Sequence, residues 1–436
     1  MADQTSRPQS HSEYRSAQDA SSEVVSSRRG PLSGVKVLDF STLLPGPYAT
    51  ALLADLGAEV THVESPTRPD LTRALPPFIE GRSAAHLSLN RGKRSVAINL
   101  KREAGLKLAL KLVEQSDIVV EQFRPGVMAR LGLDYQTLSR LNPKLIYCSI
   151  TGYGQHGPLA MRAGHDINYL ALGGVASYSG RQGEGPRLSG TQIADIAGGS
   201  YPAVIAILAA LFERQQTECG RHLDISMSDG ALALNALTLS PTMASQEDPD
   251  FGREWLNGGT LYDYYQTSDG RHLAIGALEP QFVAQLLEAL ELTSFVKDAL
   301  RPPGQQAEIK AQISVVIKSQ PLEHWREVFA GLDCCCEPVL TLTEAAQHPH
   351  FVARGAIERR AVTQTSSADR VNPDEMKSVT DSDPQMLAIS TPLGATFPSC
   401  AAHLGVPLGT HTDEVLDMLG VTPEERQQLR ADRVIK

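Results

Sequence analysis

The sequence predicts an α/β protein with a mainly parallel sheet and a second, smaller unit, and three observations lead to this class. Short apolar segments alternate with helical segments between residues 35 and 151, which is the pattern of parallel sheets. Residues 196–214 form a run of mostly small apolar side chains, typical of a buried helix. Residues 262–277 then form a hairpin pattern with an Asp-Gly turn, followed by further helices, which indicates a separate α+β unit.

A strand–helix–strand segment opens the first unit. Residues 35–40 are almost continuously apolar and predict a strand, residues 41–47 predict a loop with two prolines, and residues 48–56 predict a helix. Gly57 stands where a left-handed glycine commonly ends a helix. Residues 58–64 predict the next strand, so the two strands should be parallel neighbours.

Similar patterns predict the remaining elements. In the first unit they are a helix at 103–115, strands at 117–123, 145–151 and 223–227, and the helix at 196–214. In the second unit they are the hairpin strands at 262–267 and 272–277 and helices at 280–291, 305–318 and 321–331. Residues 1–30 lack an apolar period and predict a disordered tail. Residues 237–258 and 362–390 are predicted to be loops, and a last helix is predicted after residue 414.

Composition and charge narrow the possible partners. The 436 residues exceed the about 250–300 at which one core stops growing, so we expect more than one domain. The net charge of −10, from 40 basic and 50 acidic residues, argues against a nucleic-acid partner. The strongly apolar run 202–212 is about half of the ~20 residues of a membrane span, so we expect no membrane insertion. The adjacent cysteines Cys334–Cys336, without a Cys-x-x-Cys pair, favour a cytoplasmic protein without a zinc site.

Three polar segments are candidates for the site. The sequence has no Walker A loop and no Gly-x-Ser-x-Gly elbow, and loop 41–47 is too bulky to wrap a pyrophosphate. The candidates are His165-Asp166, which precedes a helix-like run, Asp195, which precedes paired glycines that would let a ligand approach, and Glu279, which stands between a strand and a helix.

Each candidate also has a purely structural interpretation. Asp166, Asp195 and Glu279 all stand where a carboxylate can cap a helix, and His165 would then be incidental. Cys148, in a predicted strand, is a possible nucleophile but is better interpreted as a small buried hydrophobe. Periodicity and spacing alone therefore predict that the chain is enzyme-like, but they do not identify its substrate.

Longer segments of the chain resemble the family III CoA-transferase (CaiB/BaiF) superfamily. They are GPLSGVKVLDFSTLLPGPYATALLADLGAEVTHVE, LNRGKRSVAINLK, EQFRPGVMARLGLDY, TGYGQHGP and LGTHTDEVLDMLG, and the match runs from about Gly30 to about Gly420. AGHDINY and GALEPQF are similar to the racemase branch, and so is the short Gly258-Gly259 pair, because transferases carry a longer glycine run. Asn257 replaces the aspartate usual in racemases, and Ser65 replaces a usual basic residue.

The resemblance implies the architecture. The fold class is α/β, with a Rossmann-like large domain built from both chain ends plus a smaller α+β domain, in an interlocked homodimer. The expected divisions are a tail over 1–30, the N-terminal part of the large domain over 31–225, a linker over 226–254, the small domain over 255–345, and a linker with the C-terminal part of the large domain over 346–436.

The resemblance also implies the chemistry. The expected reaction is epimerisation of 2-methyl-branched acyl-CoA thioesters by 1,1-proton transfer through an enolate. His165, supported by Glu279 from the other subunit, would serve one face of the enolate and Asp195 the other, while the backbone N–H of Asp166 would donate to the thioester oxygen. The alternative is a CoA transferase that forms an acyl-enzyme at Asp195.

Coenzyme A enters this prediction as part of the substrate, and no metal or redox cofactor is expected. The residues that the resemblance places against CoA are Lys93, Arg94, Leu100, Lys101, Arg124 and Gly164. Arg68 is a candidate to replace the basic residue missing at Ser65.

Overall fold

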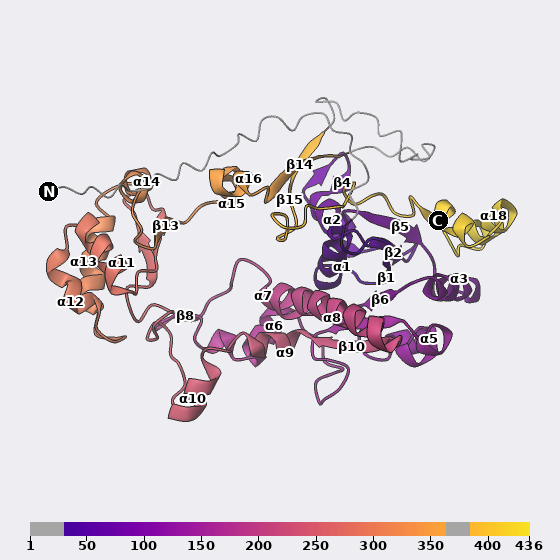
Figure 1. Cartoon of the computed structure of the whole chain (residues 1–436), viewed down its shortest axis with the longest axis horizontal. Helices are drawn as coiled ribbons and strands as arrows, with labels where there is room; N and C mark the ends of the chain where they lie inside the picture. Colours follow the sequence, from indigo (N-terminus) through magenta and orange to yellow (C-terminus); the bar gives the residue numbers. More distant parts are fainter. Residues whose placement is uncertain (1–29, 363–383) are drawn as a thin grey trace, which may run out of the picture.

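A six-stranded parallel sheet forms the centre of the larger unit (Figure 1). The computed structural model describes residues 30–362 and 384–436. The strand order is β10-β7-β6-β1-β2-β5, and every neighbouring pair is parallel. The strands are β1 Lys36–Asp39, β2 Glu59–Glu64, β5 Lys93–Ala97, β6 Ile118–Glu121, β7 Ile146–Thr151 and β10 Arg221–Ser226. The predicted α/β class with a large parallel sheet is therefore confirmed.

Helices cover both faces of this sheet, which explains why its central strands are buried and mostly apolar. Helices α1 (Pro45–Asp55) and α8 (Tyr201–Thr217) pack on one face. Helices α3 (Glu103–Glu114), α5 (Tyr135–Leu141) and α17 (Thr412–Met418) pack on the other. Because α17 comes from the end of the chain, both chain ends build this part of the molecule, which we call the sheet unit.

Helix α1 begins earlier than the sequence predicts. The expected loop ends at Pro47, whereas the helix includes both prolines, Pro45 and Pro47, in its first turn. The first turn of a helix has no internal partner for its N–H groups, so proline is tolerated there. Gly57 ends the helix with φ +97°, as the sequence predicts.

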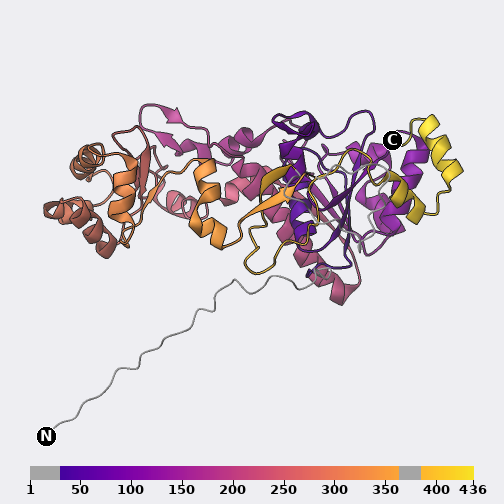
Figure 2. The same ribbon diagram turned by 90° about the horizontal axis from the view of Figure 1, so that it is seen from above.

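Residues 261–338 form what we call the middle unit, with a core of their own. Its antiparallel sheet contains β11 (Asp263–Gln266), β12 (His272–Ile275) and β13 (Cys336–Pro338). Its helices are α11 (Pro280–Ala289), α12 (Val296–Ala299), α13 (Ala307–Ile317) and α14 (Leu322–Phe329). Figures 1 and 2 show this unit at one end of an elongated molecule and the six-stranded sheet towards the other end.

The other described elements are mostly short, and all except η4, which belongs to the middle unit, lie outside that unit. They are η1 Leu71–Ala74, β3 Phe78–Ile79, β4 Arg82–Ser83, α2 Ala84–Leu89, α4 Val127–Leu131, α6 Asp166–Leu172, η2 Val175–Ser177, β8 Gly180–Arg181, β9 Gly185–Pro186, α7 Ile193–Asp195, η3 Ile196–Ser200, α9 Met227–Ala233, α10 Leu239–Ser245, η4 Thr293–Phe295, α15 Leu342–Gln347, α16 Pro349–Ala353, β14 Ile357–Ala361, β15 Gln385–Ile389 and α18 Pro423–Ala431.

Two predicted loops contain regular structure. Helix α10 lies within 237–258, and β15 lies within 362–390, where it pairs with β14. The predictions for residues 1–29 and 363–383 lie outside the described residues.

The helix predicted as buried is longer and more exposed than expected. Residues Ile193–Thr217 form one helical segment, and by length and composition alone it could cross a membrane, although 44% of its most apolar window is buried inside the protein. One face packs on the sheet, while Ile205 and Phe212 are each 66% exposed. The burial prediction is thus wrong for the outer face of this helix.

Candidate active site

Two short helices bring His165, Asp166 and Asp195 together. His165 is the residue before α6, and its backbone N–H donates to Asn168 Oδ1 at 3.0 Å. Asp195 is the last residue of α7. Asp166 Oδ1 accepts a hydrogen bond of 3.0 Å from the backbone N–H of Asp195, which joins α6 to α7. Two polar segments that are separate in the sequence therefore form one cluster.

The electrostatics of Asp195 reflect these neighbours. Burial raises the pKa of Asp195 to about 6, the charge of Asp166 adds to this effect, and His165 opposes it. The Asp195 backbone is helical, and its side chain makes no capping hydrogen bond. The Asp195 carboxyl therefore does not cap the helix, which was its purely structural interpretation. With a pKa of about 6, this carboxyl can exchange its proton near neutral pH.

A π-helical turn, η3, follows Asp195 directly. Its residues Gly198 and Gly199 are buried, and a Cβ on Gly230 of α9 would collide with the Gly198 backbone. Ser200 Oγ donates to the carbonyl of Pro45 at 2.8 Å. The paired glycines thus allow α9 to approach, rather than a ligand as the sequence suggests. π turns are frequent at functional sites, and this one fixes where α7 ends.

Tyr169 of α6 supports the loop before His165. Its hydroxyl donates to the carbonyl of Gly164 at 2.7 Å, and a Cβ on Gly164 would lie 2.7 Å from the tyrosine ring. Burial raises the pKa of Tyr169 to about 12, Asp195 adds to this effect and Arg124 opposes it. Gly164 is thus needed for packing, and Arg124 acts electrostatically on the helix that carries the cluster.

Arg124 lies in an exposed loop after β6 that a buried carboxylate holds in place. Glu121 Oε2 accepts the backbone N–H of Phe123 at 2.8 Å, and Gln122 Oε1 accepts that of Gly46 at 2.9 Å. Burial raises the pKa of Glu121 to about 7, and hydrogen bonds from Ser149 and Phe123 oppose this only in part. Sequence reasoning missed Glu121, although a carboxylate at the end of an apolar strand is a usable signal.

Three exposed cations follow the carboxyl ends of strands β2, β5 and β6 of the parallel sheet. Arg68 comes after β2, Lys101 after β5 and Arg124 after β6. Ligands of parallel sheets bind outside these ends, so the three cations are well placed for a phosphate-bearing ligand. Leu100, beside Lys101, is half-buried and packs against the core shared with α3 and α17.

Lys93 does not fit its predicted contact with CoA. Its side chain is 1% exposed, and Nζ donates to Asp39 Oδ2 at 3.0 Å, to Pro47 O at 2.9 Å and to Asn90 Oδ1 at 3.0 Å. All three donors of the ammonium are therefore used inside the protein. Lys93 is a structural partner of Asp39 and not a phosphate ligand in this arrangement.

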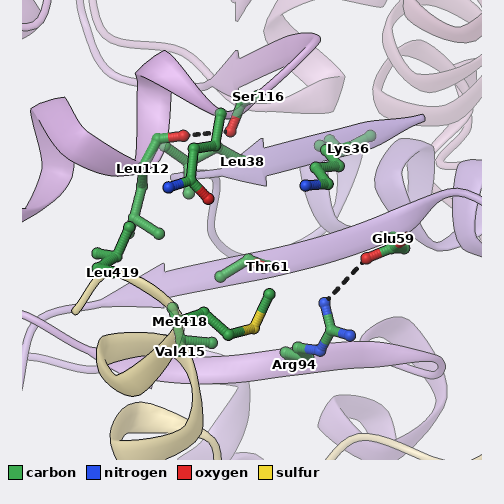
Figure 3. A pocket seen from close by; sticks show the side chains of 12 residues that line it. Lys36, Leu38, Glu59, Thr61, Arg94, Leu112, Ser116, Val415, Met418 and Leu419 are labelled. Atoms are coloured by element: carbon green, nitrogen blue, oxygen red, sulfur yellow. Dashed lines mark hydrogen bonds and ion pairs between the residues drawn. The ribbon is translucent and has the colours of Figure 1, made fainter. Parts of the chain in front are cut away.

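Arg94 does not fit its predicted contact either. It is the second residue of β5, and it forms ion pairs of 3.3 Å with Glu59 and with Glu414 of α17. Figure 3 shows its side chain directed at Glu59 and near Met418, while Lys36 lies on the far side of β2. Arg94 thus lies near the amino end of the sheet, away from the end where Arg124 is found.

Two further sequence features have structural roles. Residues 152–157 have Gly-x-Gly-x-x-Gly spacing after β7, but turns and not a helix follow them, and Gln155 N–H donates to both carboxylate oxygens of Asp224 at 3.0 Å. This is therefore not a dinucleotide-binding loop. Cys148 is 0% exposed, and burial raises the pKa of its thiol far above the usual range, which supports the interpretation as a buried hydrophobe.

Comparison with known proteins gives the family. The model of CoA-transferase family III matches residues 32–375. The chain belongs to this family. The α-methylacyl-CoA racemase of Homo sapiens is 35% identical over 93% of this chain and 97% of its own length. The acetyl-CoA:oxalate CoA-transferase of Acetobacter aceti is 34% identical over 76% of this chain and 86% of its own.

A solved structure agrees with this assignment. The crystal structure of a CAIB/BAIF family protein from Brucella suis has a TM-score of 0.71 and 28% identity, covering 90% of this chain and 100% of that chain. The predicted superfamily is therefore confirmed. Racemases and transferases both occur among the relatives, so membership of the family leaves the reaction open.

Glu279 lies apart from the other predicted catalytic residues of this family III chain. It is exposed on the middle unit, where it precedes α11, and its side chain makes no capping hydrogen bond. Within the described residues, the group it influences electrostatically is the exposed thiol of Cys335. Figure 1 shows α11 at the end of the molecule, separate from α6 and α7. One chain therefore does not bring Glu279 to His165.

Asn257 fixes the segment before the middle unit. Its Nδ2 donates to Tyr178 O at 3.2 Å and to Asp250 O at 2.8 Å, while Oδ1 accepts the N–H of Glu254 at 2.8 Å. A carboxylate could accept the third hydrogen bond but could not donate the first two. The departure from the aspartate usual in racemases thus has a local structural reason.

Proposed function

We propose that this chain epimerises 2-methyl-branched acyl-CoA thioesters by 1,1-proton transfer through an enolate. The observation that carries the proposal is the hydrogen bond from the Asp195 N–H to Asp166 Oδ1, which brings Asp195 to the start of α6, where His165 acts on it electrostatically. An imidazole and a carboxyl group of raised pKa are suited to move one proton each near neutral pH. The racemase relative, which aligns over 93% of the chain, supports this choice.

The proton steps follow from these two groups. In one direction the Asp195 carboxylate takes the α-proton, the C–H electron pair becomes part of the enolate, and the His165 imidazolium returns a proton to the opposite face. In the reverse direction the two residues exchange roles. Each positioned acid or base contributes roughly 10²–10⁴-fold to the rate.

The enolate oxygen needs a hydrogen-bond donor. The backbone N–H of Asp166 is the first of α6, and no acceptor for it is found among residues 30–362 and 384–436. We assign it to the thioester oxygen, where such a donor contributes about 3–4 kcal/mol to the stability of the transition state.

The CoA part of the substrate would bind along the carboxyl ends of the sheet strands. Arg68, Lys101 and Arg124 would contact its phosphates, and Gly164 and Leu100 would contact its apolar parts. CoA is then part of the thioester substrate and not a separate cofactor. The proposal includes no metal and no redox cofactor. We also propose that the protein is cytoplasmic.

The proposal also includes a homodimer of interlocked chains. Glu279 of the partner subunit would complete the site by supporting His165. Two features favour this arrangement. Glu279 is exposed and distant from α6 in its own chain, and the outer face of α8 leaves Ile205 and Phe212 exposed. A second copy would cover that face.

A CoA transferase is the second candidate, because several relatives carry that activity in their names, including the succinyl-CoA:glutarate CoA-transferase of Homo sapiens at 32% identity. In that reaction the Asp195 carboxylate would attack the thioester carbonyl and release the CoA thiolate. The CoA thiolate would then attack the Asp195 carbonyl of this anhydride, release the donor carboxylate and leave CoA on Asp195 as a thioester. The acceptor carboxylate would take up CoA by the same two steps in reverse, which frees Asp195. This route needs Asp195 but gives no role to His165.

Incubation with an α-methylacyl-CoA in deuterated water separates the two reactions. Epimerisation incorporates deuterium at the α-carbon without any acceptor acid, and His165→Ala should lower the rate by roughly 10²-fold or more. His156→Ala, at another exposed histidine outside the cluster, is the matched control and should leave the rate unchanged. A transferase would incorporate no deuterium, and hydroxylamine would trap its acyl-Asp195.

A further inference from the structure

Among the residues that the structure describes, the carboxylate of Asp166 forms the hydrogen bond that joins Asp195 to the start of α6, next to His165. It follows His165 in the sequence, and its Oδ1 accepts the Asp195 backbone N–H at 3.0 Å, 29 residues away along the chain. The N–H groups in the first turn of a helix have no partner inside that helix. Asp166 therefore supplies from α6 the acceptor that α7 cannot supply itself.

We propose that the Asp166 carboxylate is a positioning residue that fixes Asp195 relative to His165 and biases the Asp195 carboxyl towards its protonated form. This inference rests on the proposed function. It goes beyond the role given above to the backbone N–H of Asp166, because it concerns the charge of the side chain.

Charge and geometry act together at this contact. A negative charge beside a second carboxyl disfavours ionisation of the second group. In the site, burial is the largest cause of the raised pKa of Asp195, Asp166 is the next, and His165 acts in the opposite direction. Without Asp166, Asp195 would therefore hold its proton less tightly.

The other ionisable groups around Asp195 do not replace this effect. Helix α7 packs against α6 and α9. Besides His165 and Asp166, α6 carries Tyr169, which is neutral at physiological pH because its pKa is about 12. Helix α9 carries Asp229 in its first turn, and this exposed carboxylate is not among the groups that shift the pKa of Asp195.

Asp166→Asn separates charge from geometry. The amide keeps an oxygen that can accept the Asp195 N–H but loses the negative charge. We expect the acid limb of the pH dependence of kcat/KM for deuterium exchange to move to lower pH by up to about one unit. Asp166→Ala removes the acceptor as well, so it should show the same shift together with a further drop of about tenfold in the pH-independent rate.

Asp229→Asn is the matched control, because it neutralises a carboxylate of a neighbouring helix that has no bond to α7. It should leave the acid limb in place. If Asp166→Asn lowers the rate but leaves the limb unchanged, or if Asp229→Asn shifts the limb equally, the proposed role of Asp166 is wrong.

A second readout keeps this inference separate from the proposed reaction. The carboxyl ¹³C resonance of Asp195, identified by its loss in Asp195→Asn, reports the protonation of this residue in the resting enzyme. It should titrate at lower pH in Asp166→Asn than in the wild type. If the wild type exchanges no α-proton but this titration still moves, the reaction is wrong and the role of Asp166 stands. An unmoved titration overturns that role whatever the reaction.

Discussion

The sheet unit and the middle unit hold their predicted catalytic groups in different ways. His165 and Asp195 are placed by hydrogen bonds within their own chain, through Asp166 and the turn that follows Asp195. Glu279 makes no side-chain hydrogen bond or ion pair to any residue that the structure describes, and it is exposed. The difference indicates that the proposed proton-transfer pair is preorganised within one chain, whereas Glu279 is not held near it; in the proposed homodimer, the support of His165 would come from a second chain.

The largest expected effect is the recovery of deuterium exchange when two inactive variants are combined in one dimer. This experiment tests whether the two units of one site come from different chains. Asp195→Ala and Glu279→Ala, each prepared alone, should lose roughly 10²–10⁴-fold in deuterium exchange. In a heterodimer of the two, one site is intact, because the Glu279→Ala chain supplies Asp195 and the Asp195→Ala chain supplies Glu279. The other site lacks both residues. Heterodimers purified from co-expressed chains with different tags should therefore recover about half of the wild-type rate.

The matched control combines Asp195→Ala with His165→Ala. Both residues belong to the sheet unit, so each site of this heterodimer keeps one damaged residue and should stay inactive. Recovery in both heterodimers, or in neither, would contradict the division of the site between two chains.

The sheet unit contains a buried ion pair between Lys93 and Asp39, and replacing Lys93 tests how much this pair contributes to stability. Replacing Lys93 by Met leaves Asp39, which is 0% exposed, without its cation, and this should cost about 3–5 kcal/mol of unfolding free energy. Arg124→Met removes an exposed cation and should leave stability nearly unchanged while raising KM for acyl-CoA about tenfold. Urea unfolding and steady-state kinetics measure both. A stable Lys93→Met enzyme with a raised KM would restore Lys93 as a phosphate ligand.

These residues also mark the limit of what the sequence predicts. Strands β1 and β7 can be predicted because their apolar runs are short and bounded. His165, Asp195 and Glu279 stand out because each follows a loop or ends a strand. The burial of Lys93 cannot be predicted from the local sequence, because its partner Asp39 lies 54 residues away. The bond from Asp195 to Asp166 likewise depends on a contact between two helices, which no local pattern contains.

The pH dependence of stability offers a third test of the sheet unit. The pKa of Glu121 is about 7 in the folded protein against an ordinary value of 4.5, so the folded state favours the protonated form. The wild type should lose roughly 3 kcal/mol from this group as the pH rises from 4.5 to 7. Glu121→Gln cannot ionise and should gain that amount relative to the wild type over the same range, as measured by urea unfolding. A constant difference between the two proteins across this range would refute a buried, protonated Glu121.

The smallest expected effect concerns the segment that joins the two units. Asn257→Asp loses the two hydrogen bonds donated to Tyr178 and Asp250 and should cost about 1–3 kcal/mol, visible as faster amide exchange in residues 250–263. The change restores the aspartate usual in racemases, and Asp195 and His165 are untouched, so deuterium exchange should stay near the wild-type rate. The ion pairs of Asp263 with Arg181 and Lys310 hold the same segment from the other side. If Asn257→Asp changes neither stability nor amide exchange, these ion pairs alone fix the middle unit, and the asparagine is not required there.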